Sequence, residues 1–142
     1  MSIVSQSIFL GFTQGLPTYS LGTSSTSVNE GSTVTFTTTT ANVSSGTTLY
    51  WSVSGVSSSD FTVNSTTGSF TIGSNGQGSV SLTLSSDSST EGTEYFTFYV
   101  RTGSTSGTIV ATSPQITVND TSISSIPFSA NYVLIGGGGG GG

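Results

Sequence analysis

The feature that most constrains the fold is a two-residue alternation of apolar and polar side chains, which recurs between residues 24 and 122. Val34 and Phe36 alternate with threonines, and Leu49 and Trp51 alternate with polar residues in the same way. Successive side chains of a β-strand point to opposite faces, so this period is typical of strands that are buried on one face. It predicts strands at residues 32–41, 48–54, 60–63, 68–72, 78–84, 94–101 and 108–119.

Turn-forming residues separate these runs, and no segment shows the period of an amphipathic helix. Asn75-Gly76 predicts a hairpin. Pro114 predicts a bulge or a sheet edge inside the last run, because proline donates no backbone hydrogen bond. About seven short strands at this spacing predict an all-β fold, an immunoglobulin-like Greek-key β-sandwich. The side chains predicted to form its core are Phe36, Trp51, Phe61, Phe70, Leu82, Phe96, Phe98 and Val118.

The two ends of the chain differ from this patterned middle zone. We expect residues 1–23 to form an extended N-terminal arm with one strand at residues 7–12, and residues 24–122 to form the sandwich. Residues 123–142 form a C-terminal tail that ends in seven consecutive glycines, Gly136–Gly142. Such a glycine run is typical of a linker or of closely packed backbones, and we expect the chain to continue into a longer protein.

Charge and reactive side chains are scarce, and this excludes several functions. The chain has one Arg, no Lys, no His, no Cys and six acidic residues, giving a net charge of −5. Binding to nucleic acid or to an anionic membrane surface requires basic residues. Without His and Cys the usual pairs of nucleophile and base are missing, so we predict no enzyme activity. No stretch is long and apolar enough to insert into a membrane.

The six acidic residues lie mostly in turns or where a predicted strand begins or ends. Several strand ends meet at each pole of a Greek-key sandwich, so we expect carboxylates from different loops to converge. Converging carboxylates repel one another unless a cation offsets their charge, and Ca²⁺ accepts many oxygen ligands. Two interpretations stay open at this point: a divalent-cation site, or turn residues that cap loops and keep the domain soluble.

Five stretches, taken in their order along the chain, resemble the Calx-beta domain, an immunoglobulin-like sandwich of cation exchangers and extracellular adhesion proteins. They are VNEG at residues 28–31, SDF at 59–61, GSF at 68–70, DSSTEGTEYF at 87–96 and ITVND at 116–120. The resemblance implies calcium ligands at Glu30, Asp60, Asp87, Glu91 and Asp120, and a structural role for Glu94. Calx-beta domains that bind calcium strongly have runs of Asp where this chain has Ser86, Thr121 and Ser122. The resemblance therefore implies at most one weakly bound calcium ion.

The segment TEGTEYFTFYVRTGS at residues 90–104 also resembles modules of cyanophage and other marine phage structural proteins. This resemblance implies a virion structural protein, either the N-terminal module of a tail fibre or a capsid-surface decoration. Such a protein works by assembly and surface attachment. The implied location is the virion surface, and the implied partners are other virion proteins, copies of itself in a trimer, and a host-surface glycan or protein.

Two alternative functions remain open. One is a calcium-dependent adhesion module of a bacterial surface protein, and the other is a carbohydrate-binding module. Tyr50, Tyr95 and Tyr99 alternate away from the predicted core, so they are candidates for an exposed contact surface. Arg101, the only basic residue, is expected to pair with a nearby carboxylate at the surface.

Overall fold

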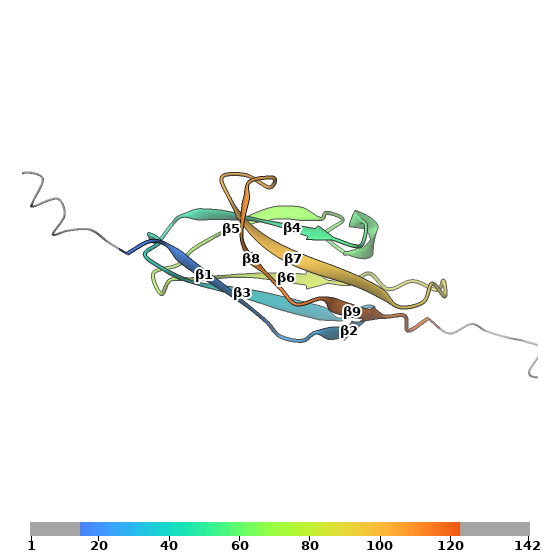
Figure 1. Cartoon of the computed structure of the whole chain (residues 1–142). Helices are drawn as coiled ribbons and strands as arrows, with labels where there is room; N and C mark the ends of the chain where they lie inside the picture. Colours follow the sequence, from blue (N-terminus) through green and yellow to red (C-terminus); the bar gives the residue numbers. More distant parts are fainter. Residues whose placement is uncertain (1–14, 123–142) are drawn as a thin grey trace, which may run out of the picture.

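Alternating threonine and apolar side chains determine the two faces of the longest strands, and these strands pack as two β-sheets (Figure 1). The computed structural model describes residues 15–122. In chain order the elements are β1 (Thr18–Thr23), β2 (Ser27–Asn29), β3 (Thr33–Ala41), β4 (Thr48–Ser54), the 3-10 turn η1 (Ser58–Asp60), β5 (Thr67–Thr71), β6 (Gln77–Thr83), β7 (Glu94–Thr102), β8 (Thr108–Thr112) and β9 (Ile116–Asn119). The predicted all-β sandwich is confirmed.

One layer is an antiparallel three-stranded sheet in the order β1-β3-β6. Its inner face carries Val34 and Phe36 from β3, and its outer face is lined with hydroxyl groups. Thr33 and Thr83 meet across β3 and β6 with their hydroxyl oxygens 2.7 Å apart. The hydroxyls of paired residues therefore bond to one another across the outer face of this sheet.

The other layer has six strands in the order β2-β9-β7-β4-β5, with β8 also paired to β7. The short β2 runs parallel to β9, whereas β7 pairs antiparallel with β4, β8 and β9. β8 pairs with the end of β7, near Tyr99, and β9 pairs with its beginning, near Glu94. Pro114 lies between β8 and β9. The interruption predicted at this proline is confirmed, and it allows one edge of β7 to be shared by two short strands.

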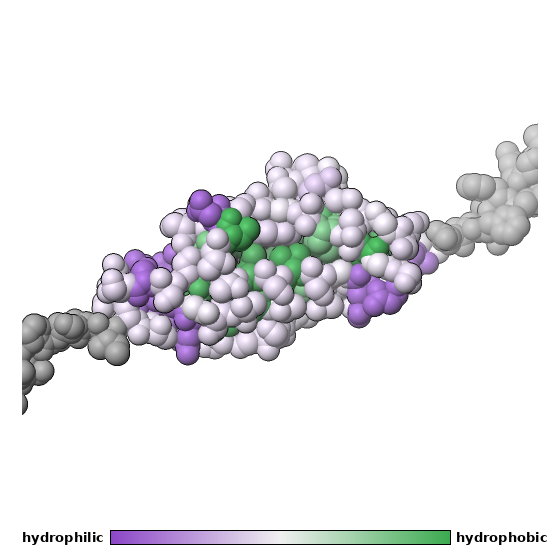
Figure 2. Space-filling model, turned by 180° about the vertical axis from the view of Figure 1, so that it is seen from behind, coloured by the Kyte–Doolittle hydropathy of each residue, from purple (hydrophilic) through white to green (hydrophobic). Residues whose placement is uncertain are grey.

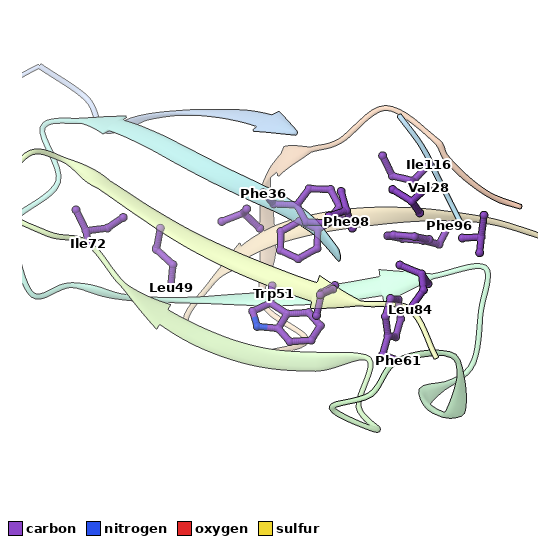
Figure 3. Close-up of a cluster of buried hydrophobic side chains, with 14 residues drawn as sticks. Val28, Phe36, Leu49, Trp51, Phe61, Ile72, Leu84, Phe96, Phe98 and Ile116 are labelled. Atoms are coloured by element: carbon purple, nitrogen blue, oxygen red, sulfur yellow. The ribbon is translucent and has the colours of Figure 1, made fainter. Parts of the chain in front are cut away.

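Aromatic side chains from both sheets form the centre of the core (Figure 3). The rings of Phe36 on β3 and Phe98 on β7 stack with centroids 4.1 Å apart and planes 4° from parallel. Trp51 on β4 stacks against the other side of this pair, 5.7 Å from Phe98. The predicted core residues are buried, except for Phe70, which is half-buried near the edge of β5.

Two sequence-based boundaries differ from the structure. Thr18–Thr23 form β1 within the sandwich and do not belong to an arm, because Tyr19 and Leu21 pack against the core and the strand pairs along β3. The run at residues 60–63 is not a regular strand. It begins at the last residue of η1, contributes the buried Phe61 through one bridge to Leu84, and leaves Val63 54 % exposed. The strand predicted at residues 7–12 and the tail at 123–142 lie outside the described residues.

The prediction at Asn75-Gly76 is correct for the turn but wrong for the hairpin. Gly76 has a φ of 81°, which is in the left-handed region, and its N–H donates to Gly73 O at 3.0 Å. The flanking strands then separate, because β5 pairs with β4 in one sheet and β6 pairs with β3 in the other. The turn therefore connects the two layers of the sandwich.

The described chain enters the sandwich at one end and leaves it at the opposite end (Figure 1). At the entry, the Asn42 side-chain amide, just after β3, donates to Leu16 O at 3.1 Å. At the exit, the Ser122 hydroxyl donates to Ser89 O in the loop before β7 at 2.7 Å. β3 runs between these two ends, and its nine residues correspond to a length of roughly 30 Å at about 3.3 Å per residue. Within the described residues, no helix is long and apolar enough to cross a membrane.

A carboxylate cluster as the candidate functional site

All six acidic side chains of the chain gather at the end of the sandwich where the described chain leaves it. Backbone hydrogen bonds bring the separate loops together there. The N–H of Glu30, after β2, donates to Asn119 O at 3.1 Å, and the N–H of Ser85 donates to Asp60 O at 2.8 Å. We call this end the acidic pole; its carboxylates belong to Glu30, Asp60, Asp87, Glu91, Glu94 and Asp120. Figure 2 shows the strongly hydrophilic residues toward the two ends of the body, with hydrophobic residues exposed between them among residues of intermediate hydropathy.

Three of these carboxylates lie close enough together to share a cation. One carboxylate oxygen from each of Asp60, Glu91 and Glu94 lies within 4.8 Å of the other two. Asp60 ends η1, Glu91 lies in the loop before β7, and Glu94 is the first residue of β7. The resemblance to the Calx-beta domain implies a structural role for Glu94 and no role as a ligand. The structure brings its carboxylate into the cluster.

Repulsion among these groups is visible in the pKa of Glu94. Burial raises its pKa above the ordinary value of 4.5, and the charges of Asp60 and Glu91 raise it further. A smaller contribution in the same direction comes from Glu30 and Asp87. A proton or a cation at this position would relieve the repulsion.

Glu30 stands at the inner side of the cluster. Its Oε1 atom is buried and has no hydrogen-bond partner among the described residues. Burial raises the pKa of Glu30, and so do the charges of Asp120, Asp87 and Glu91, while the backbone N–H of Asp87 acts in the opposite direction. A buried carboxylate oxygen without a partner has lost its contact with water and gained no compensating bond.

Asp120 has a different role, because the loops already use both of its oxygens. Its Oδ2 accepts hydrogen bonds from the backbone N–H groups of Glu91 and Gly92, and its Oδ1 accepts from the N–H and hydroxyl of Ser122. The bond from the Ser122 hydroxyl is the main reason that the pKa of Asp120 is held well below its usual range. Asp120 therefore anchors the loop before β7 to the end of β9.

Asp87 and Asp60 also take part in local turns. Asp87 Oδ1 accepts the N–H of Ser89 at 2.9 Å. Asp60 Oδ2 accepts the N–H and the hydroxyl of Ser57 at 2.7 and 3.1 Å and so caps η1. Each carboxylate retains an oxygen that is not used in this way. The residues thus fit a hard cation such as Ca²⁺ in donor type. Of the five ligands predicted from the sequence, the structure brings Asp60 and Glu91 together with Glu94, whereas Glu30, Asp87 and Asp120 lie outside this group of three.

Comparison with known proteins adds no assignment. No protein-family model and no curated protein matches the chain. One similar chain comes from a solved structure described as "Structural basis of T cell specificity and activation by the bacterial superantigen toxic shock syndrome toxin-1". It has a TM-score of 0.35 and 12 % identity, over 70 % of this chain and 97 % of that chain. A TM-score of this size does not establish a shared fold, and nothing about function follows from it.

Proposed function

We propose that this chain is a structural module of a virion, in a tail fibre or a capsid-surface decoration, which works by assembly and surface attachment. The observation that supports the proposal is the passage of the chain from one pole of an elongated sandwich to the other (Figure 1). A module whose entry and exit lie at opposite ends can be placed in series between an anchoring part and a projecting part. Two packed sheets around an aromatic core make the body rigid.

The hydroxyl-rich and weakly charged surface is compatible with this role. The chain has 5 % charged residues, and the paired hydroxyls of β3 and β6 satisfy one another on the outer face of the three-stranded sheet. The phage-like segment at residues 90–104 contains β7, the strand that joins most of the larger sheet. We place the protein on the virion surface, in contact with other virion proteins and with copies of itself.

Particle association tests this proposal directly. Particles from the native source are purified on a density gradient, and peptides from residues 18–122 are quantified in each fraction by mass spectrometry. We expect the peptides to peak with the particle fractions at a fixed ratio to the major capsid protein. Recovery of the peptides only in the soluble fractions or with host membranes contradicts the proposal.

A second candidate is a calcium-dependent adhesion module, and the acidic pole favours it. Buried Glu30 Oε1 has no partner among the described residues, and the pKa values of Glu30 and Glu94 are raised by their acidic neighbours. Calcium bound to the folded state raises the melting temperature in proportion to the logarithm of its concentration above Kd. This candidate predicts a rise that Glu91→Gln and Glu94→Gln each reduce. A melting temperature that is equal in calcium and in chelator excludes it.

A further inference from the structure

The only cation of the chain lies far from the acidic pole and is fixed in place by neutral groups. Arg101 lies near the end of β7, whereas Glu94 begins the same strand, a separation of roughly 23 Å at about 3.3 Å per residue. The expected ion pair is therefore wrong. Arg101 Nε donates to the Ser52 hydroxyl at 2.8 Å, and Nη1 donates to Gly107 O at 2.8 Å. The guanidinium also lies over the ring of Tyr99, 5.8 Å from its centroid.

Strand register places an aromatic and apolar group on each side of this guanidinium. Tyr50 on β4 is directly opposite Arg101, and Ile109 on β8 is its partner on the other side. Directly opposite residues of an antiparallel pair share one face of the sheet. The neighbours Trp51 and Val100 point into the core, so this set points outward.

A β-bulge marks the same position. The register of β7 and β8 shifts between Val100 and Arg101. Bulges of this kind change the direction of a side chain and are over-represented next to functional sites. Tyr50, Tyr99 and Arg101 are half-buried, and Ile109 is 44 % exposed. The four side chains therefore form a surface that is partly fixed by packing and still accessible to solvent. We call it the Arg101 face.

We propose that the Arg101 face binds the carboxylate of an acidic sugar, such as a uronic or sialic acid, within a surface glycan. Arginine has five N–H donors, and its hydrogen bonds to the described residues use two of them. The remaining donors have the planar fork that matches a carboxylate. Tyr50 and Ile109 supply apolar surface for the sugar ring, and the Ser52 hydroxyl and the Tyr99 ring lie beside the guanidinium.

The charge of the chain favours an acidic sugar over an acidic protein segment. A net charge of −5 repels a partner with many negative charges, and one cation offsets little of that repulsion. A single carboxylate on an otherwise neutral, hydroxyl-rich ligand gains the contact with Arg101 and suffers the least repulsion. The inference deepens the proposed surface attachment by naming the ligand class. It is independent of particle association, because a chain that binds no sugar can still assemble into a virion.

The test is a titration of the ¹⁵N-labelled full chain with glucuronic acid and with N-acetylneuraminic acid, followed by NMR. Glucose serves as the neutral control and a hexaglutamate peptide as the acidic protein control. We expect shifts confined to the backbone around Tyr50, Tyr99, Arg101 and Ile109, and at least about tenfold weaker binding of glucose. Arg101→Gln should weaken acidic-sugar binding at least about tenfold, and Arg101→Lys should weaken it less, because it keeps the charge without the fork.

Two further variants keep the test decisive. Tyr50→Ala leaves both hydrogen bonds of Arg101 in place, so it reports on the face even if Arg101→Gln fails to fold, and it should also weaken binding. Tyr95→Ala is the matched control, because Tyr95 is an exposed tyrosine on the same outer face of β7, at its other end. Equal binding of glucose and glucuronic acid, shifts at the acidic pole, an unchanged affinity in Arg101→Gln, or tighter binding of hexaglutamate each overturns the proposal.

Discussion

Ser113→Ala should destabilise the fold far more than the loss of one hydroxyl group at the surface. Ser113 is buried and lies between β8 and Pro114. Its hydroxyl accepts the backbone N–H of Phe98 at 3.0 Å and donates to Pro114 O at 2.7 Å. Phe98 is itself fully buried at the centre of the aromatic core. Without the hydroxyl, the N–H of Phe98 has no partner at a position that water does not reach.

The magnitude follows from this lost partner. A buried donor left without a hydrogen bond costs about 1–3 kcal/mol, and the small void left by one oxygen adds little. For a domain of this size a loss of about 1 kcal/mol lowers the melting temperature by roughly 4–8 °C. We therefore expect the free energy of unfolding to fall by about 2 kcal/mol and the melting temperature to fall by roughly 10 °C.

Urea unfolding followed by tryptophan fluorescence measures this change, because Trp51 packs against Phe98. Ser79→Ala is the control: its hydroxyl meets that of Thr37 at 3.3 Å on the exposed outer face of β6, so its removal should cost less than about 0.5 kcal/mol. If Ser113→Ala costs no more than this control, the hydrogen bond between Ser113 and Phe98 does not hold the edge of β7.

Three further variants test the acidic pole and the packing. Glu30→Gln should raise the melting temperature at pH 7, because the pKa of Glu30 is raised in the folded state. The contribution of Glu30 to stability is therefore full below pH 4.5 and declines as the pH rises through its pKa in the folded state. Between pH 4 and pH 8 the melting temperature should thus fall less steeply for Glu30→Gln than for the wild type. Equal slopes of melting temperature against pH would refute this. Asp120→Asn should lower the melting temperature at pH 7, because the lowered pKa of Asp120 contributes stability above pH 3.8 that is lost as the pH falls further. The difference in melting temperature from the wild type should therefore shrink in acid. A difference that is independent of pH would mean that the charge of Asp120 contributes nothing and that only the geometry of its hydrogen bonds matters. Gly68→Ala places a Cβ atom 2.5 Å from Trp51 Nε1, so urea unfolding should show a loss of about 1–3 kcal/mol, whereas an unchanged midpoint means that the ring moves freely.

Much of the fold could be predicted from the sequence, because alternation reports directly on burial. Val34 and Phe36 on β3, or Phe96 and Phe98 on β7, could be assigned to the core from their spacing alone. The pairing of the strands was harder to predict from the sequence. The turn at Asn75-Gly76 does not make a hairpin, since which sheet each flanking strand joins depends on contacts distant in sequence.

The site was predictable as a gathering of acids but not in its details. Asp60 and Glu91 lie in turns or at strand ends, so the sequence could predict that they converge. Whether Glu94 joins the cluster depends on the direction of its side chain at the start of β7, which the sequence does not show. The role of Asp120 depended on backbone N–H groups that no residue pattern reveals. Arg101 was expected to pair with a carboxylate, because a sequence does not show that all carboxylates lie at the far end of its strand.

Light scattering of the full-length protein, in calcium and in chelator, tests the central claim of a self-assembling structural module most directly. We expect a stable oligomer, a trimer for a fibre, whose mass does not change with dilution or with removal of calcium. A monomer at every concentration would contradict assembly from copies of the chain, and an oligomer that forms only in calcium would favour the adhesion module instead.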